Sequence, residues 1–294
     1  MKSIQSRGER VFQAADVAVM LLLMLAMAYP LIYTVLASVS DSYQLMSSPG
    51  LLYKPLGFSL DAYSMVLKNR SIYTGYTSTL LYVSVGTLIN LTMTSMAAYS
   101  LALRKLKLRD TIMFLITFTM MFNGGLIPTY LQVKSLGLMN TMWAVVLPVA
   151  INTQNLIIMR TAFRAIPESL SESAKIDGAG EFRVFWQIYL PLAKATIAVM
   201  VLFYGVSHWN SWFSAAIYLR DRSKYPLQLI LREILIQNST EFMTSGSGVG
   251  EDTLAVAESI KYATIVVSTV PILCIYPLLQ KYFVHGVMIG AIKG

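Results

Sequence analysis

The sequence predicts an all-α integral membrane protein with six transmembrane helices and both termini in the cytoplasm. Of its 294 residues, 55% are hydrophobic and only 13% are charged, whereas a soluble domain spends about a quarter of its residues on charge. Six apolar stretches are long enough to cross a bilayer as a helix, which takes roughly 20 residues. The basic residues between them are unevenly divided, and this division sets the orientation.

The six predicted spans form a single transmembrane domain over residues 1–294. They occupy residues 17–39, 75–103, 111–133, 138–159, 192–219 and 262–283. A cleaved signal peptide is an alternative for the first span, since Met1 to Arg10 is basic and Ala26-Met27-Ala28 resembles a cleavage site. Apolar sequence continues through Val39, however, well beyond the roughly 7–15 residues of a signal-peptide core. We therefore expect the segment to be retained as the first span.

Charge placement predicts the orientation, because cytoplasmic loops of membrane proteins are rich in lysine and arginine. Six spans place both termini on one side. That side holds fourteen of the 23 basic and seven of the 15 acidic residues, a net charge of +7 against +1 on the other side. We expect the termini, the loop 104–110 and the segment 160–191 to be cytoplasmic. The total of +8 thus reflects membrane orientation and does not indicate a nucleic-acid partner.

The composition also argues against other classes of membrane protein. Charged residues are absent from the interiors of the predicted spans, where ion-driven carriers usually need them. One cysteine and two histidines offer neither an intrachain disulfide nor a metal cluster, and a membrane enzyme would need convergent catalytic groups. The glycine-rich run at 246–252 lacks the lysine of a nucleotide-binding P-loop. We interpret that run as part of an external loop.

The segment 166–191 is unusually polar for a membrane protein. Pro167 suits the first turn of a helix, and Ile166, Leu170 and Ala174 form a narrow apolar stripe along it. Glycines at 178 and 180 interrupt this helix, and a second amphipathic helix is predicted over 181–190. Periodicity alone is equally typical of a helix lying at the membrane surface, with Trp186 and Tyr189 among the headgroups.

The spacing within this segment resembles a known signature. Glu172-Ser173-Ala174, three residues, Gly178, nine residues and Ile188-Tyr189-Leu190-Pro191 match the EAA motif of ABC importer permeases, written E-A-A, three residues, G, nine residues, I-x-L-P. The one departure, Ser173, exchanges one small residue for another. Further similarity lies in "FNGGLIPTYL" at 122–131, "HWNSWF" at 208–213, "YPLQLILREIL" at 225–235 and "GVMIGAIKG" at 286–294. The chain resembles the second permease subunit of maltose-type carbohydrate importers, in the branch that takes up oligosaccharides.

This resemblance implies a set of partners. The chain would pair with a second, homologous permease in the lipid bilayer of the bacterial cell membrane, dock on a cytoplasmic ABC ATPase dimer and receive its oligosaccharide from an extracellular solute-binding protein. It would have no catalytic site and bind no cofactor, because ATP and Mg²⁺ belong to the partner ATPase. The implied ATPase-coupling residues are Ile166, Leu170, Glu172, Ser173, Ala174, Asp177 and Gly178. A tail containing Gly286, Gly290 and Lys293 would reach the ATPase interface, although a frayed terminus is the default interpretation of such a tail.

Candidate substrate contacts are aromatic and amide side chains inside the spans, because rings stack on pyranose faces and amides bind hydroxyl groups. The candidates are Asn123, Asn152, Asn155, Trp209, Asn210, Trp212 and Phe213. Each could instead serve helix packing, and Trp212 could belong to an interfacial aromatic belt. The sequence leaves open whether the sugar is neutral or acidic. With no lysine or arginine well inside the spans, an acidic sugar would need a partner chain or helix dipoles. An ion-coupled carrier and an importer of another solute are the alternative functions.

Overall fold

A computed structural model describes residues 7–48, 50–237, 259–274 and 277. The elements it describes are helical, as the sequence predicts. The chain divides into two compact units. The first contains residues 1–69 and 233–269, and the second contains residues 70–232 and 270–294.

The first unit contains the N-terminal helix α1 (Arg7–Ser38), followed by the short helices α2 (Ser42–Ser47) and α3 (Asp61–Lys68). The first helix is strongly apolar, yet none of its most hydropathic window is buried within the chain. Its apolar side chains are therefore available to lipid or to another subunit. Asp41 caps α2 by accepting a hydrogen bond from the backbone N–H of Gln44 at 3.1 Å. A small core of Ala37, Leu45 and Leu52 closes this end of the unit.

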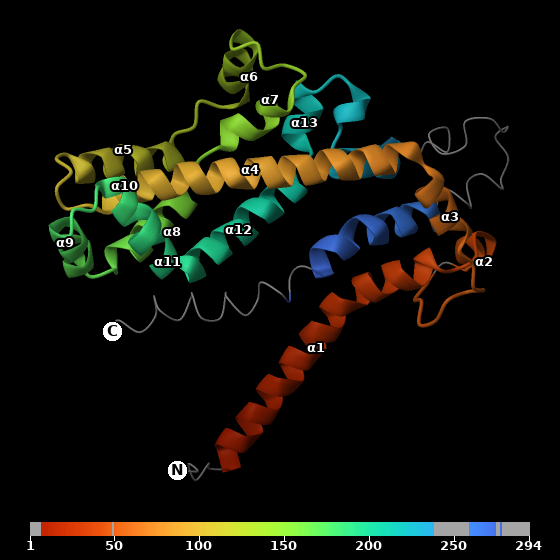
Figure 1. Cartoon of the computed structure of the whole chain (residues 1–294). Coiled ribbons are helices and arrows are strands. Elements are labelled where there is room, and N and C mark those ends of the chain that lie inside the picture. Colours follow the sequence, from red (N-terminus) through yellow and green to blue (C-terminus); the bar gives the residue numbers. More distant parts are fainter. Residues whose placement is uncertain (1–6, 49, 238–258, 275–276, 278–294) are drawn as a thin grey trace. The chain divides into compact units, whose positions relative to one another are not determined.

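The second unit is built on one long helix, α4 (Arg70–Ala102). Helices α8 (Thr153–Arg164) and α12 (Lys194–Trp209) pack along it, as Figure 1 shows. The remaining helices of this unit are α5 (Arg109–Met121), α6 (Leu126–Ser135), α7 (Met142–Val146), η1 (Leu147–Val149), α9 (Glu168–Ile176), α10 (Glu181–Val184), η2 (Phe185–Tyr189), α11 (Leu190–Leu192), α13 (Phe213–Tyr218) and η3 (Arg222–Lys224). Helix α14 (Leu227–Gln237) and a helix over Ser259–Cys274 complete the described residues.

Two of the described helices, Gly8–Ser38 and Arg70–Ala102, are long and apolar enough to cross a membrane unaided. Three further pairs of helices pass the same test only together, and each pair is bent. The bend is 113° between Arg109–Met121 and Leu126–Ser135, 52° between Met142–Val149 and Thr153–Arg164, and 82° between Glu181–Leu192 and Lys194–Trp209. If each bent pair is counted as one span, the described residues contain up to five membrane spans. The apolar helix Ser259–Cys274 is too short to pass the same test.

The three predicted spans in the middle of the chain are each divided into two helices. The predicted span 111–133 breaks after Met121, where Gly125 has a φ of +87° and Oδ1 of Asn123 accepts a hydrogen bond from the Gly125 N–H at 2.8 Å. A positive φ favours glycine and ends a right-handed helix. The predicted span 138–159 is interrupted before Thr153 and runs on to Arg164, and the predicted span 192–219 stops at Trp209 before a second short helix. Most of 275–283, in the sixth predicted span, lies outside the described residues.

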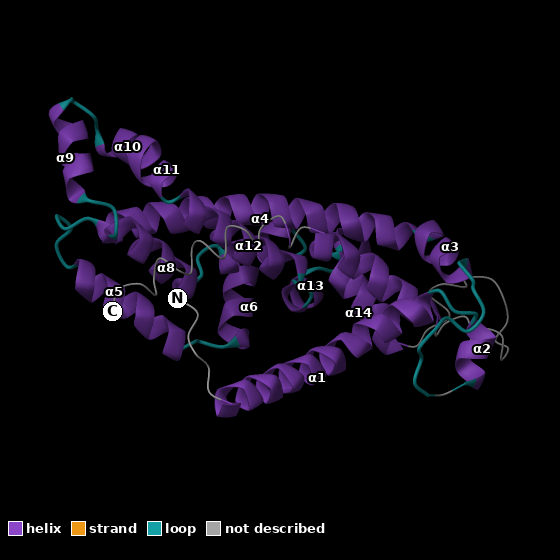
Figure 2. Ribbon diagram, turned by 90° about the horizontal axis from the view of Figure 1, so that it is seen from below, coloured by secondary structure: helices purple, strands orange, loops and turns teal. Residues whose placement is uncertain are grey.

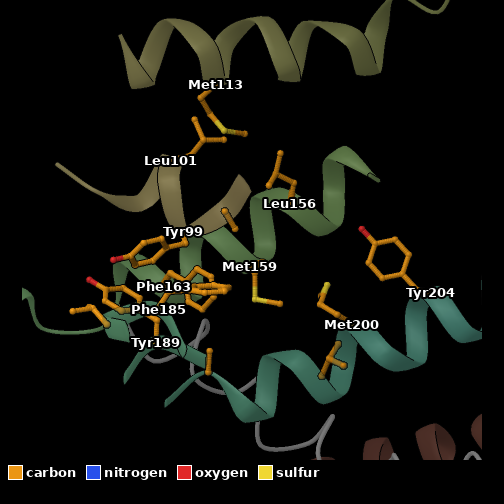
Figure 3. Close-up of a cluster of buried hydrophobic side chains, with 14 residues drawn as sticks. Tyr99, Leu101, Met113, Leu156, Met159, Phe163, Phe185, Tyr189, Met200 and Tyr204 are labelled. Carbon is orange, nitrogen blue, oxygen red and sulfur yellow. The ribbon is translucent and has the colours of Figure 1, made fainter. Parts of the chain in front are cut away.

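The largest core of the second unit lies where α4, α8 and the helices after residue 181 meet. Its centre is a cluster of four aromatic side chains, Tyr99, Phe163, Phe185 and Tyr189, shown in Figure 3. The ring centroids of Tyr99 and Tyr189 are 4.9 Å apart at an interplanar angle of 77°. Edge-to-face pairs of this kind add about 0.5–1.5 kcal/mol to the burial of the rings. The polar segment 166–191 is thus fixed to the end of α4 by a well-packed apolar base.

Candidate functional site

The polar segment 166–191 folds as a short helix, a glycine bend and a second helix, which Figure 2 shows beside the end of α4. Pro167 is the N-cap of α9, one position before the first turn in which the sequence placed it. The helix ends in a Schellman motif: the Ala179 N–H donates to the Ala174 carbonyl at 2.9 Å, and the Gly178 N–H donates to the Lys175 carbonyl at 3.0 Å. Gly178 has a φ of +82°, a conformation in which a side chain costs about 1–2 kcal/mol. The glycine of the EAA-like spacing is therefore required by the local backbone.

A polar bridge connects this segment with α4. Nζ of Lys175 lies 2.6 Å from Oε1 of Glu181, and the hydroxyl of Tyr99 donates to Oε2 of the same carboxylate at 2.8 Å. The hydrogen bond from Lys175, together with that from Tyr99, lowers the pKa of Glu181. We call Lys175, Glu181 and Tyr99 the polar bridge. It joins α9, α10 and the long helix in one hydrogen-bonded chain, and the sequence offered no signal of it.

The second helix of the segment is irregular. Between α10 and α11, the five residues Phe185–Tyr189 form a π-helical turn, a feature that recurs at functional sites of α-helical proteins. Two of its side chains, Phe185 and Tyr189, are buried in the aromatic cluster. The prediction of a helix over 181–190 is confirmed, but the turn changes which side chains share a face.

The predicted coupling residues do not all share one surface. Glu172, Ser173, Asp177 and Gly178 are exposed. Ile166 and Ala174 are instead half-buried against the protein's own core, and of the predicted stripe only Leu170 is largely exposed. The most exposed apolar side chain of α9 is Ile176, at 86%. The predicted stripe at intervals of four residues did not include this side chain.

The interruption of the fourth predicted span is stabilised by side chains of its two neighbours. Nδ2 of Asn90 in α4 donates to the carbonyls of Val149 at 2.6 Å and Ala150 at 3.0 Å. From α12, the Tyr204 hydroxyl accepts from the Asn152 N–H at 3.3 Å. Non-helical backbone at membrane depth persists only where such partners satisfy its polar groups. Side chains of α4 and α12 therefore stabilise the break in the helix.

A buried histidine extends this network. Nε2 of His208 lies 2.6 Å from Oδ1 of Asn90. Since the amide nitrogen of Asn90 donates to two carbonyls, its oxygen must accept, so Nε2 of His208 carries the proton. Gly86 makes room for the ring, because a Cβ at that position would lie 2.5 Å from Nε2. His208 is a satisfied structural group here.

Beside this network lies a cavity of about 750 Å³. Its apolar wall includes Val149, Leu202 and Phe203. Its polar lining consists of Asn152, Gln154, Asn155, Tyr204, Ser207, His208 and Asn210. A chamber of this size, with a few convergent polar groups on an apolar wall, has the properties of a small-molecule site.

The cavity brings together three of the seven predicted substrate contacts, Asn152, Asn155 and Asn210. The other four lie elsewhere. Asn123 accepts a hydrogen bond within its own turn, and Trp209 is buried with its ring centroid 6.4 Å from that of Tyr76. Trp212 packs against Arg232, whose guanidinium carbon lies 4.0 Å from the ring centroid. Phe213 is exposed beside Trp212. Sequence reasoning missed Gln154, Tyr204 and Ser207. The sequence did contain a signal for this break: Pro148 is typical of the end of one helix, and Asn152 is a typical N-cap for the next.

The tail residues Gly286, Gly290 and Lys293 lie outside the described residues. Their predicted role at an ATPase interface remains a prediction.

Apolar helices of membrane-spanning length, a polar segment anchored on one of them and a polar cavity beside a broken helix define a membrane permease for small solutes. The model of the family described as binding-protein-dependent transport system inner membrane component matches residues 90–289. The chain belongs to this family and is a multi-pass protein of the bacterial plasma membrane with no catalytic function of its own.

Individual relatives extend this match over nearly the whole chain. The chain is 41% identical over 290 residues to the polygalacturonan/rhamnogalacturonan transport system permease protein YtcP of Bacillus subtilis, covering 97% of this chain and 99% of that protein. It is 42% identical over 265 residues to protein LplC of the same organism, covering 90% and 89%. A solved bacterial ABC transporter that imports the acidic polysaccharide alginate has a chain 31% identical to this one, with a TM-score of 0.87 and coverage of 96% of this chain and 100% of that chain.

Proposed function

We propose that this chain is the transmembrane permease subunit of an ATP-driven, binding-protein-dependent importer of oligosaccharides. The observation that carries the proposal is the full-length similarity to a permease named for polygalacturonan and rhamnogalacturonan transport. The fold of the alginate importer chain, at a TM-score of 0.87, supports the same class of substrate. The chain would supply half of a translocation pathway that opens alternately to the two sides of the membrane.

The proposal includes a topology. Six spans in a single domain over residues 1–294 would place both termini and the polar segment 166–191 in the cytoplasm, in agreement with the excess of basic residues on that side. The two long helices and the three bent pairs contain five of these spans, and residues 181–191 of the third pair would lie on the cytoplasmic side. The sixth would begin with the helix Ser259–Cys274 and continue beyond the described residues.

The partners follow from the family. A second, homologous permease would complete the pathway, a cytoplasmic ATPase dimer would bind ATP and Mg²⁺, and an extracellular solute-binding protein would deliver the sugar. The exposed surface of α9 supports docking on the ATPase, because Ile176 presents an apolar side chain on the same face as the exposed Glu172, four residues earlier. An apolar contact with a polar rim is the usual composition of a protein interface.

The polar bridge and the aromatic cluster would transmit movement of the docked helix to the membrane. Lys175 lies in α9 itself, Glu181 follows the glycine bend, and Tyr99 lies near the end of α4. A displacement of α9 as a rigid body therefore acts directly on the long helix. Since α8 and α12 pack along α4, the cavity between them would change with it.

Uptake by proteoliposomes tests the proposal. The liposomes contain this chain, a second permease and an ATPase, and they receive radiolabelled oligogalacturonides with or without the binding protein and ATP. We expect uptake only when every component is present. Uptake by this chain alone, driven by an ion gradient and insensitive to ATP, would overturn the proposal in favour of an ion-coupled carrier.

A further inference from the structure

We propose that the N-terminal end of α8 is a subsite for a carboxylate, the acidic group of a uronic acid residue as it passes through the cavity. This inference rests on the proposed function and names the substrate class for it. The N-terminus of a helix carries a partial positive charge and unpaired N–H groups, so it attracts anions. Half-helices inside transporters use their N-termini in this way.

The first turn of α8 leaves donors free for such a group. An α-helix cannot satisfy the N–H groups of its first turn internally. At the start of α8, Oδ1 of Asn152 accepts the hydrogen bond of only one of them, the N–H of Asn155, at 3.0 Å. The N–H groups of Thr153 and Gln154 are thus left over, in a helix of twelve residues with a full macrodipole. The side chains of Gln154 and Asn155 line the cavity at this end.

Asn155 supplies an independent observation that a ligand belongs here. The residue is only 8% exposed, yet its side-chain amide forms no hydrogen bond with any described residue and lies on the cavity wall. The amide of Asn155 is not among the fully buried unpaired groups of the described residues, so its free hydrogen-bonding capacity is open to the cavity. A carboxylate oxygen in the cavity would accept from this amide and from the N–H groups of the first turn.

The remaining cavity wall favours an acidic group over a neutral one. Aspartate and glutamate, which only accept hydrogen bonds and would repel an anion, are absent from the described lining. The tryptophans predicted to stack on sugar rings, Trp209 and Trp212, lie outside it. Asn90 holds the carbonyls of Val149 and Ala150, which precede α8 in the chain, in hydrogen bonds of their own.

Lysine and arginine are also absent from the described lining. A carboxylate would therefore be held by hydrogen bonds and a helix dipole alone. Such binding is strong enough to guide an acidic chain and weak enough to release it, which a transport pathway requires.

The test compares uptake of an oligogalacturonide with uptake of the same chain after reduction of its carboxylates to alcohols. The complete importer carries Gln154→Glu or Asn155→Asp in this chain. Gln132→Glu in α6 is the matched control, because Gln132 is exposed and does not line the cavity. An added acid at a helix N-terminus stabilises the helix, so a purely structural effect of Gln154→Glu would not lower uptake.

We expect Gln154→Glu and Asn155→Asp to lower uptake of the acidic chain about tenfold, corresponding to the loss of one favourable anion contact at a helix end and its replacement by repulsion. Uptake of the reduced chain, which also reports on folding, should be unchanged, as should both rates in Gln132→Glu. Equal loss of both substrates in both variants, or no loss of either, would overturn the inference. If the wild-type importer takes up the reduced chain but not the acidic one, the carboxylate subsite is overturned and the proposed function stands. If it takes up neither chain, both the subsite and the proposed function are overturned.

Discussion

The hydroxyl of Tyr99 lies 2.8 Å from Oε2 of Glu181, and this one hydrogen bond joins α4 to the segment that carries the EAA-like spacing. Eighty-two residues of sequence separate the two side chains. The aromatic cluster holds the ring of Tyr99 on its other side. Packing and hydrogen bonding thus connect the same two elements, and their contributions can be separated by removing the hydroxyl alone.

Tyr99→Phe should lower ATP-dependent uptake several-fold, because the ring remains packed while the polar bridge loses its contact with α4. The ATPase activity stimulated by the binding protein should persist, since docking of α9 is unaffected. Tyr189→Phe is the control, because its hydroxyl forms no hydrogen bond with the described residues and its ring belongs to the same cluster. Uptake and hydrolysis that stay coupled in Tyr99→Phe would show that packing alone transmits the movement.

Gly178→Ala should destabilise the end of α9 by about 1 kcal/mol, because Gly178 has a φ of +82° and an alanine is strained there. The surrounding space is open, with nothing within 4 Å of an added Cβ. Gly180 is also open but has a φ of −70°, which any residue adopts. Thermal unfolding in detergent and uptake should both fall in Gly178→Ala and remain normal in Gly180→Ala. Equal behaviour of the two variants would contradict a backbone requirement.

Gly86→Ala should disrupt the network at the break in the fourth span. The new Cβ would lie 2.5 Å from Nε2 of His208, and an imidazole ring cannot bend away as a flexible chain would. His208 would leave Asn90, and the carbonyls of Val149 and Ala150 would lose their ordered partner. Gly205→Ala is the control, because its nearest neighbour is Oγ1 of Thr87 at 4.0 Å. We expect a lower unfolding temperature in Gly86→Ala alone, and a wild-type temperature there would be incompatible with the network.

The polar bridge should also respond to acid. Its hydrogen bonds lower the pKa of Glu181 in the folded state. The bridge therefore stabilises the protein fully above the pKa of the unfolded state, about 4.3 for glutamate, and this contribution is lost as the pH falls through the lower folded-state value. Because the Glu181 side chain is 54% exposed, solvent screening keeps the effect small. Stability measured from neutral pH to below pH 4 should fall less steeply in Glu181→Gln than in the wild type. Parallel curves would contradict the bridge.

Local signals predicted the polar segment well, because its structure depends on neighbouring residues. Pro167 before a helix and Gly178 after it are backbone preferences that the structure confirms. The long spans were less predictable, since hydropathy measures length and composition and does not report a bend at Gly125. The cavity depended on contacts such as that between His208 and Asn90, 118 residues apart in the sequence. A pattern in one segment carries no record of such a partner.

The π-helical turn over Phe185–Tyr189 affects how this family can vary in length. A π turn takes up one more residue than an α turn, so the chain stores a spare residue between α9 and the start of α12. Deleting one residue from the turn would restore an α-helix, and the side chains before and after the turn would keep their faces, because the wider turn takes up the extra residue. Related chains whose second helix is one residue shorter should therefore be aligned with a gap inside this turn. An alignment that placed the gap elsewhere would assign the wrong side chains to the cavity.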